Sequence, residues 1–388
     1  MAGTTTAVSV QSVTCQRLTV PLHTPFVTAL RRTDTCDTLV VRVTDSEGVT
    51  GWGEAPQVWQ VTGESLASAR ACIEQMLVPW VVGRPVDDWR EASTDCQRAV
   101  ARNFGAKAAV DVALHDLAAR RSGLPLTQFL RAEYAAPWSV ETRVVGATRV
   151  STDVTLSAGS AAGLGVAAAN CVADGFSTLK LKVGTDAVTD VARVRAVREA
   201  VGSRVVLRLD ANQGWSREEA VEVIRALESA DLGVELVEQP VAGDDVEGLA
   251  WVRSHVGLPV MADESLYSLL DLDRILRLGA ADLVNVKLAK CGSLAVAALL
   301  LRRAAEAGLG TMVGTMMESH VGVGAAASLS AAVPTSSSLM TDDLDAAWWA
   351  ACPAVEGGLT YDGSVLTLPD APGLGITGMS PGVDGGGP

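Results

Sequence analysis

The sequence has no apolar run that approaches the length of a membrane span, so we expect no membrane-spanning helix. Residues 1–6 also lack a basic region followed by an apolar core, so we expect no signal peptide. Positive charge is scarce, because 31 Lys and Arg residues face 45 Asp and Glu residues and leave a net charge of −14. This balance argues against nucleic acid or an anionic membrane as a partner.

Paired cysteines are absent as well. The seven cysteines are odd in number, widely scattered and without a Cys-x-x-Cys pair, so we expect reduced thiols in a cytoplasmic protein. What the chain does have is bulk, with 388 residues of which 48% are hydrophobic and 20% are charged. That composition is typical of a globular protein with a large core, and the length fits two domains.

The first part of the chain reads as an antiparallel sheet followed by helices. Strands are predicted at residues 8–21, 38–44 and 49–54, loops at 23–32 and 56–64, and helices at 65–78, 87–96 and 104–121. The first loop carries two adjacent cations, Arg31 and Arg32, although a solvated surface loop would carry such charges too.

From about residue 150 the pattern changes to alternating strands and helices. Strands are predicted near 151–157, 177–183, 204–210, 234–238, 259–262, 282–287, 309–313 and 339–341. Helices are predicted near 160–173, 187–201, 216–229, 245–255, 268–278, 292–306 and 319–332. This alternation is typical of βα repeats around a parallel sheet.

The strand predicted at 177–183 carries two lysines on one face. Lys180 and Lys182 alternate with apolar residues, and because side chains alternate along a strand, both ammonium groups point the same way. Two inward-facing lysines are costly to bury unless something uses them. The alternative interpretation is a solvated face on an edge strand.

Four further predicted strands each lead to a charged residue. These residues are Asp210, Glu238, Asp263 and Lys287, which follow Lys182 at successive intervals of 28, 28, 25 and 24 residues. In a (β/α)8 barrel the C-terminal ends of the strands converge on one mouth, so the spacing predicts one shared site. Three carboxylates suit Mg2+ with positions left open for a substrate, and lysines on opposite sides suit proton transfer.

Taken together, these motifs resemble the enolase superfamily, in its muconate-lactonising subgroup, over nearly the whole chain. The motifs are Lys180-Leu-Lys182, Asp210-Ala-Asn212-Gln213-Gly214-Trp215, Glu238-Gln239-Pro240, Ala262-Asp263-Glu264-Ser265 and Asn285-Val286-Lys287. The resemblance implies an α/β fold, a modified (β/α)7β TIM-type barrel at 136–349 with an N-terminal α+β capping domain at 1–135. A C-terminal segment at 350–388 would return to the cap.

The resemblance also implies roles for the charged residues. Asp210, Glu238 and Asp263 would bind Mg2+, Lys182 and Lys287 would be the acid/base pair, and Lys180 would hold the substrate carboxylate and lower the pKa of Lys182. Elementary chemistry supports these roles, since taking a proton from the carbon next to a carboxylate builds up negative charge that Mg2+ neutralises. A lysine on each face points to racemisation or epimerisation, although the subgroup also uses such lysines for cycloisomerisation and dehydration.

Two acids near the last predicted strand bear on the substrate. In an extended chain Asp343 and Asp345 would point the same way, which suits a substrate ammonium group, although a loop acid cluster or a helix N-cap is the alternative. An Asp-x-Asp here resembles the dipeptide epimerases, in which it holds the free α-ammonium group. By the same resemblance Arg31 would contact a substrate side-chain carboxylate. Further substrate contacts would come from Thr62, Asn212, Glu264, Met316 and Glu318.

The leading hypothesis is therefore Mg2+-dependent epimerisation of a dipeptide at its C-terminal residue. The expected partner is this small-molecule substrate, and a homo-oligomer is left open. N-acylamino-acid racemisation, o-succinylbenzoate synthesis and muconate cycloisomerisation are alternatives in the same superfamily. The Asp pair argues against them, because an acylated nitrogen is uncharged and a muconate dianion would be repelled. A non-catalytic binding protein would require a lost ligand or lysine, and all six are present.

Overall fold

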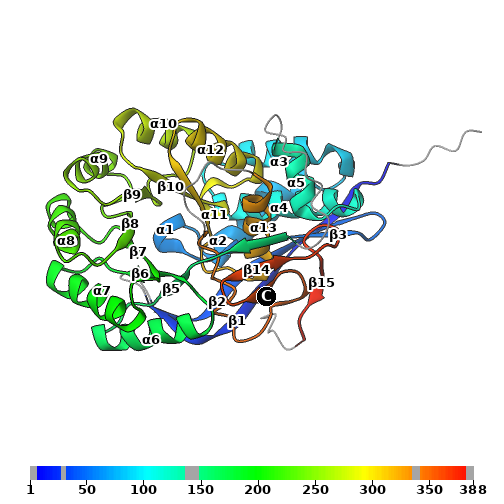
Figure 1. The fold of residues 1–388 in the computed structure, drawn as a ribbon. Coiled ribbons are helices and arrows are strands. Elements are labelled where there is room, and N and C mark those ends of the chain that lie inside the picture. The colour runs from blue at the N-terminus through cyan, green and yellow to red at the C-terminus, as the bar shows by residue number, and fades with distance from the viewer. Residues whose placement is uncertain (1–6, 28–31, 136–147, 334–340, 382–388) are drawn as a thin grey trace, which may run out of the picture.

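The computed structural model describes residues 7–27, 32–135, 148–333 and 341–381. It contains a ring of parallel strands surrounded by helices and, beside it, a smaller antiparallel sheet with its own helices (Figure 1). Within the described ranges no helix is long and apolar enough to cross a membrane. The fold is therefore the predicted α/β architecture, a TIM-type barrel with an N-terminal capping domain.

The capping domain is built on a three-stranded antiparallel sheet. Its strands lie in the order β1 (Val10–Val27), β2 (Arg32–Asp45) and β3 (Thr50–Pro56). Strand β1 is longer than predicted, because its pairing with β2 resumes beyond an irregularity between Pro21 and Phe26. The charged residues and prolines of this stretch predict a loop. A local irregularity instead absorbs the shift in register, and the hydrogen-bond ladder between β1 and β2 continues beyond it.

The rest of the capping domain is helical. Its elements are α1 (Trp59–Thr62), α2 (Leu66–Ala71), η1 (Cys72–Leu77), η2 (Val78–Trp80), η3 (Val86–Asp88), α3 (Trp89–Ala99), α4 (Phe104–Arg121) and α5 (Leu126–Tyr134). The helix predicted at 65–78 is interrupted, since α2 passes into a π-helical turn and then a 3₁₀ turn. Pro79 has no N–H group with which to continue an α-helical ladder. Helix α4 packs directly on β3, where a Cβ at Gly53 would lie 1.9 Å from the carbonyl oxygen of Ala109.

The barrel sheet has seven parallel strands in the order β11-β10-β9-β8-β7-β6-β5. The strands are β5 (Val154–Leu156), β6 (Thr178–Lys182), β7 (Val206–Asp210), β8 (Val234–Glu238), β9 (Val260–Ala262), β10 (Leu283–Lys287) and β11 (Gly310–Gly314). The helices are α6 (Ala161–Ala173), α7 (Ala187–Val201), α8 (Arg217–Ser229), α9 (Val246–His255), α10 (Leu269–Leu278), α11 (Leu288–Cys291), α12 (Leu294–Glu306) and α13 (His320–Ala332). Their alternation with the strands confirms the predicted βα repeats.

The ring closes through two adjacent aspartates. Asp342 bridges Thr152, just before β5, and Asp343 bridges Gly314 at the end of β11. The eighth strand predicted at 339–341 lies outside the described residues except for Thr341, which is not in a strand. Two isolated bridges therefore join the first and last strands of the described sheet.

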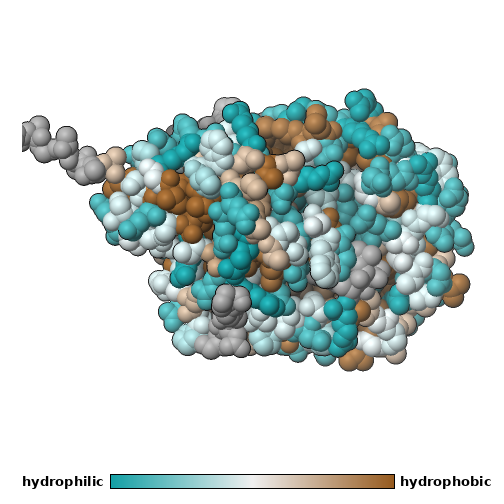
Figure 2. All heavy atoms as spheres, turned by 180° about the vertical axis from the view of Figure 1, so that it is seen from behind, coloured by the Kyte–Doolittle hydropathy of each residue, from teal (hydrophilic) through white to brown (hydrophobic). Residues whose placement is uncertain are grey.

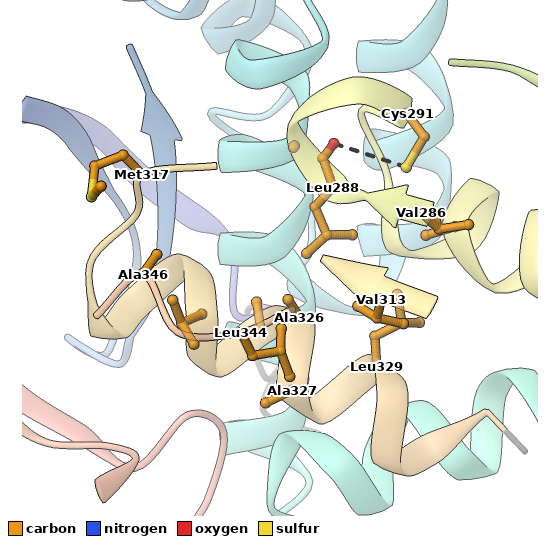
Figure 3. Packing of buried hydrophobic residues seen from close by; sticks show 14 of the residues in the cluster. Val286, Leu288, Cys291, Val313, Met317, Ala326, Ala327, Leu329, Leu344 and Ala346 are labelled. Carbon is orange, nitrogen blue, oxygen red and sulfur yellow. Dashed lines mark hydrogen bonds between the residues drawn. The ribbon is translucent and has the colours of Figure 1, made fainter. Parts of the chain in front are cut away.

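Buried apolar residues of the described ranges form three clusters, one of which joins Val58 of the cap to Ala289 and Met316 of the barrel. Leu236, Met261, Leu283 and Met312 make a small cluster of their own. A much larger one joins the strands to the surrounding helices and the cap, and Figure 3 shows the part of it that includes Leu329 of α13. The face seen in Figure 2 is mostly hydrophilic with scattered hydrophobic patches, as expected when most apolar side chains are buried in the interior.

Two buried carboxylates of the cap bind the N-termini of barrel helices. Asp111 of α4 accepts a hydrogen bond from the backbone N–H of Leu294, the first residue of α12, at 2.8 Å. Glu54 of β3 accepts hydrogen bonds from the N–H groups of Ser319 and Gly322 at the start of α13, both at 2.8 Å. Because free N–H groups at a helix N-terminus favour negative charge, these contacts fix the cap to the loops that follow β10 and β11.

The C-terminal segment packs on both parts of the molecule. Its strands are β12 (Val355–Gly357), β13 (Thr360–Asp362), β14 (Val365–Leu368) and β15 (Ile376–Met379). Strand β14 pairs with β4 (Thr148–Ser151), which leads into the barrel. Gly373 exchanges backbone hydrogen bonds with Leu124 and Leu126 of the cap, each at 2.8 Å. The segment therefore links the cap to the start of the barrel.

Candidate active site

Charged side chains gather at the C-terminal ends of neighbouring barrel strands. The parallel register pairs Lys182 at the end of β6 with Asp210 at the end of β7, and Asp210 with Glu238 at the end of β8. Asp263 directly follows β9, and Lys287 ends β10. The register therefore brings the five residues of the spaced sequence pattern to one mouth of the barrel.

Lys180 lies among the carboxylates in one half of this cluster. Its Nζ atom lies 2.6 Å from Glu238 Oε2, 2.9 Å from Asp343 Oδ2 and 3.1 Å from Asp210 Oδ2. Lys182 donates to the same Asp210 oxygen at 2.6 Å. All five side chains are buried, so these charges interact more strongly than they would at the surface.

The other half of the cluster is centred on Asp263. Lys287 Nζ lies 2.8 Å from Asp263 Oδ2, and Lys290, which is completely buried, donates to Asp263 Oδ1 and to its backbone oxygen. Lys287 Nζ is also 3.9 Å from Asp343, which connects the two halves. A Cβ at Gly314 would lie 2.8 Å from Lys287 Cε, so glycine there leaves room for this lysine.

Lys180 and Lys287 hold their protons tightly in this arrangement. Burial disfavours the charged form of Lys180, but the carboxylates of Asp343 and Glu238 outweigh it and raise its pKa well above the ordinary value. Lys287 shows the same balance, with Asp263 as the main opposing charge, and its pKa is raised. For these two lysines the contacting carboxylates therefore prevail over burial.

The acids of the cluster fall into two groups. Burial alone would raise the pKa values of Asp210 and Asp263, but the lysines that contact them hold both pKa values low. Burial raises the pKa of Glu238 to about 7. It raises the pKa of Glu264 to about 8, and the charge of Asp263 adds to this shift. The cluster therefore contains more carboxyl groups than its lysine ammonium groups can pair with.

The charges and the unpaired atoms fit a divalent cation. The cluster has six carboxyl groups, on Asp210, Glu238, Asp263, Glu264, Asp343 and Asp345, and four ammonium groups, on Lys180, Lys182, Lys287 and Lys290. If all are ionised, two negative charges remain uncompensated. Glu264 Oε2, Asn212 Oδ1 and Asn285 Oδ1 are buried without a hydrogen-bond partner. Oxygen donors of this kind are the ligands that Mg2+ prefers.

Ammonium groups lie between the carboxylates in this structure. Accordingly, no group of three or more His, Cys, Asp or Glu side chains in the described part of the chain is already drawn together as a metal site. The lysine nitrogens contact the oxygens of Asp210, Glu238 and Asp263 instead.

The charged cluster faces a cavity between the barrel and the cap. The lining residues are Phe26, Val58, Gln60, Val61, Thr155, Lys180, Lys182, Asn212, Asp263, Glu264, Lys287, Thr315, Met316, Met317, Asp343, Asp345, Ala346 and Trp349. We call the charged residues at the strand ends the floor, which comprises Lys180, Lys182, Asp210, Glu238, Asp263 and Lys287. Residues 57–62 of the capping domain form the cap wall, and residues 342–349 form the acidic wall.

The two predicted aspartates both face this cavity from the acidic wall. Asp345 Oδ2 accepts hydrogen bonds from the backbone N–H of Thr155 at 2.7 Å and from Trp349 Nε1 at 2.9 Å. Both donors bind the same oxygen, so neither engages Oδ1. Burial, together with the charge of Asp343, raises the pKa of Asp345. A cationic ligand between the two acids would relieve this repulsion.

The other predicted substrate residues divide into two sets. Asn212, Glu264 and Met316 line the cavity. Thr62 and Glu318 lie behind the lining residues. The Thr62 hydroxyl donates to the carbonyl of Val58 in the cap wall at 3.2 Å, and Glu318 Oε1 accepts from the backbone N–H of Met316 at 2.9 Å. These two residues support lining residues and do not themselves belong to the lining.

Only one of the two predicted cations of the first loop lies within the described residues. Arg31 lies outside the described residues. Arg32 is exposed and pairs with Asp34 at 3.2 Å. Phe26, on the extension of β1 that was predicted as loop, lines the cavity instead.

Sequence reasoning assigned no role to two residues that hold the floor in place. Lys290 lies three residues after Lys287 in an otherwise apolar stretch, and that is a usable signal, because a lysine there is buried only if it is paired. Gln239 Oε1 accepts the backbone N–H groups of Asp263 and Ser265, at 2.9 and 3.1 Å. Its φ of 36° is a left-handed conformation that no sequence pattern indicates.

Comparison with known proteins covers both parts of the molecule. Residues 10–130 match the family model of the mandelate racemase/muconate lactonizing enzyme N-terminal domain, and residues 164–379 match that of the enolase C-terminal domain-like proteins. The L-Ala-D/L-Glu epimerase of Bacillus subtilis (strain 168) is 40% identical over 367 residues, which are 94% of this chain and 95% of that protein.

Solved structures agree with this relationship. A substrate-liganded complex of the L-Ala-D/L-Glu epimerase from Bacillus subtilis has a TM-score of 0.88 and 39% identity, covering 96% of this chain and 99% of that one. The dipeptide epimerase from Enterococcus faecalis V583, complexed with Mg and the dipeptide L-Leu-L-Tyr, has a TM-score of 0.86 and 35% identity, covering 95% and 99%. The chain belongs to the mandelate racemase/muconate lactonizing enzyme family of the enolase superfamily, as its motifs predict.

Proposed function

We propose that this protein is an isomerase that epimerises a dipeptide at the α-carbon of its C-terminal residue, with Mg2+ as its cofactor. The observation that carries the proposal is the placement of Lys182 and Lys287 around one cavity. Lys182 ends β6 and Lys287 ends β10, and three strands separate them in the sheet order. Two lysines so placed would approach a bound substrate from opposite sides of the barrel mouth.

Two bases on opposite sides account for inversion at carbon. One lysine, in its neutral form, takes the α-proton, and the electron pair of the broken C–H bond moves into the adjacent carboxylate to give an enediolate. The other lysine, in its ammonium form, delivers a proton to the opposite face. Lys180 keeps its charge between Glu238 and Asp343 and would help to neutralise the substrate carboxylate.

Asp210, Glu238 and Asp263 would hold Mg2+. Their oxygen donors, the surplus of negative charge and the unpaired oxygen of Glu264 support this assignment. When bound, Mg2+ would supply positive charge that stabilises the enediolate and, by sharing the carboxylates, would lower the raised pKa values of Lys180 and Lys287. The relative from Enterococcus faecalis was solved with Mg, which supports the choice of metal.

The acidic wall supports a substrate with a free ammonium group. Asp343 and Asp345 line the cavity beside the floor, where they would meet the ammonium group of a dipeptide whose carboxylate lies on the floor. An N-acylated amino acid would place an uncharged amide beside these acids, and muconate would add two negative charges. We therefore favour a dipeptide over the substrates of racemases and cycloisomerases. The relative from Bacillus subtilis is an L-Ala-D/L-Glu epimerase, and the relative from Enterococcus faecalis was solved with the dipeptide L-Leu-L-Tyr.

Isotope exchange tests this proposal directly. The protein would be incubated with Mg2+ and a library of L,L-dipeptides in D2O, and mass gain and the configuration of the C-terminal residue would be followed together. We expect deuterium at that α-carbon with the appearance of the L,D-dipeptide. Exchange confined to N-acylated amino acids, with dipeptides left untouched, would contradict the proposal.

We also propose a cytoplasmic location. Cys72, Cys96, Cys171 and Cys291 are buried thiols that take part in no disulfide. Free thiols are typical of a reducing compartment.

Analytical ultracentrifugation would establish whether the protein forms a homo-oligomer.

A further inference from the structure

The chain has three tyrosines, and each uses its hydroxyl group to join two elements. Tyr267 and Tyr361 donate to backbone carbonyls in the two walls of the cavity, whereas Tyr134 bonds to His115 inside the capping domain. All three side chains are partly buried, and burial raises the pKa of each. Each hydroxyl is therefore protonated near neutral pH and can donate a hydrogen bond.

The cap wall has little internal structure to hold it in place. Its helix α1 is a single turn without a buried residue, and Trp59 in it is 60% exposed. One helical turn is not stable by itself. Val61, which lines the cavity, accepts the hydroxyl of Tyr267 at its carbonyl at 2.7 Å. Because Tyr267 belongs to the barrel loop after β9, this bond ties the cap wall to the barrel.

Tyr267 is itself fixed from the side of the floor. The Nζ atom of Lys290 lies 5.7 Å from the centre of the tyrosine ring, and the ring of Phe104 lies 6.1 Å away. Lys290 also binds Asp263 of the floor. Contacts therefore run without a break from Asp263 through Lys290 and Tyr267 to Val61 of the cap wall.

The acidic wall is held in a corresponding way. Tyr361, on β13, donates its hydroxyl to the carbonyl of Leu344 at 2.6 Å. Leu344 stands between the two aspartates, and its side chain belongs to the same buried cluster as Ala326 and Ala327 of α13 (Figure 3). The path of the backbone from Asp343 to Asp345 is therefore fixed on one side by packing and on the other by a tyrosine of the C-terminal segment.

We propose that Tyr267 and Tyr361 are positioning residues that fix the two walls of the cavity relative to the floor. This inference rests on the proposed function. Neither tyrosine belongs to the cavity lining, so each acts through the wall segment that it holds. The cap wall, through Val58 and Val61, offers apolar contact to a substrate side chain, and the acidic wall offers carboxylates to its ammonium group. Loss of each hydroxyl should therefore have its own kinetic signature.

Replacing each tyrosine by phenylalanine tests the proposal, since only the hydroxyl is lost. The variants Tyr267→Phe and Tyr361→Phe, with Tyr134→Phe as a matched control, would be assayed with Mg2+ on a dipeptide and on its N-acetylated form. We expect Tyr267→Phe to raise KM about fivefold with kcat within about twofold, the size expected for one neutral hydrogen bond. Tyr361→Phe should reduce the preference for the free dipeptide about fivefold. The control should match the wild type.

Hydrogen exchange gives a readout that does not depend on activity. Exchange at residues 57–62 should become faster only in Tyr267→Phe, and exchange at 342–349 only in Tyr361→Phe. Wild-type kinetics in both variants, or faster exchange spread evenly over the chain, would overturn the positioning role. A wild-type protein inactive on dipeptides would contradict the proposed function instead, and the exchange measurement would still decide whether the tyrosines hold the walls.

Discussion

The floor and the walls of the cavity are held by different means. Floor residues lie at the ends of barrel strands, are buried, and contact one another through ion pairs such as Lys180 with Glu238. The walls are loop segments, and each of them accepts a hydrogen bond from a tyrosine hydroxyl, from Tyr267 or Tyr361. A strand ladder fixes position precisely, whereas a loop can change its residues without disturbing the fold. The molecule thus separates the groups suited to proton transfer from the groups suited to substrate selection.

The largest effect is expected from the acids of the floor. Asp210→Asn, Glu238→Gln or Asp263→Asn should lower turnover by at least about a thousandfold, because the developing enediolate loses its main counter-charge. The fold should persist, which circular dichroism would check, and Mg2+ binding by calorimetry should weaken in parallel. Full activity in EDTA-treated wild-type protein would show that the metal assignment is wrong.

Substitution of each floor lysine should reveal which face of the substrate that lysine serves. Lys182→Ala and Lys287→Ala should each abolish epimerisation, since each removes the base from one face. Each variant should still exchange the α-proton from one configuration only, and the two should prefer opposite configurations. Proton NMR in D2O on the L,L- and L,D-dipeptides would measure this. Exchange of the same isomer by both variants would exclude the two-face arrangement.

An intermediate effect is expected from the acidic wall. Asp345→Asn keeps a side chain able to accept from Thr155 and Trp349 but removes a charge. Loss of one partner from a desolvated charge pair costs roughly 2–5 kcal/mol, so kcat/KM for dipeptides should fall about a hundredfold. Activity on the N-acetylated dipeptide should be unchanged or improved. An equal loss on both substrates would make Asp345 a purely structural residue.

A smaller effect is expected from the residue that orients this carboxylate. Trp349→Phe removes the Nε1–H that binds Asp345 but keeps an aromatic ring beside Phe26. We expect kcat/KM for dipeptides to fall about tenfold, the low end of the range for loss of one hydrogen bond to a charged group. Trp348→Phe is the control, because this neighbour is outside the cavity lining. Equal losses in the two variants would indicate a packing effect.

The sequence predicts the floor well, because regular strand spacing carries long-range information. Once Lys182, Asp210 and Glu238 are assigned to strand ends, the parallel register makes them neighbours. The walls follow no such rule. Tyr267 lies 206 residues from its partner Val61, and no local pattern relates them. The extension of β1 is equally hidden, because it depends on pairing with β2 beyond an irregularity.

Glu54 and Asp111 have a consequence for how the molecule unfolds. Each belongs to the cap, yet each satisfies the first turn of a barrel helix, α13 or α12. A barrel without its cap would leave those N–H groups unsatisfied, and a cap without its barrel would lose the partners of two carboxylates buried in the assembled protein. The two domains therefore depend on each other for stability, and we expect the chain to unfold in one cooperative transition and not domain by domain.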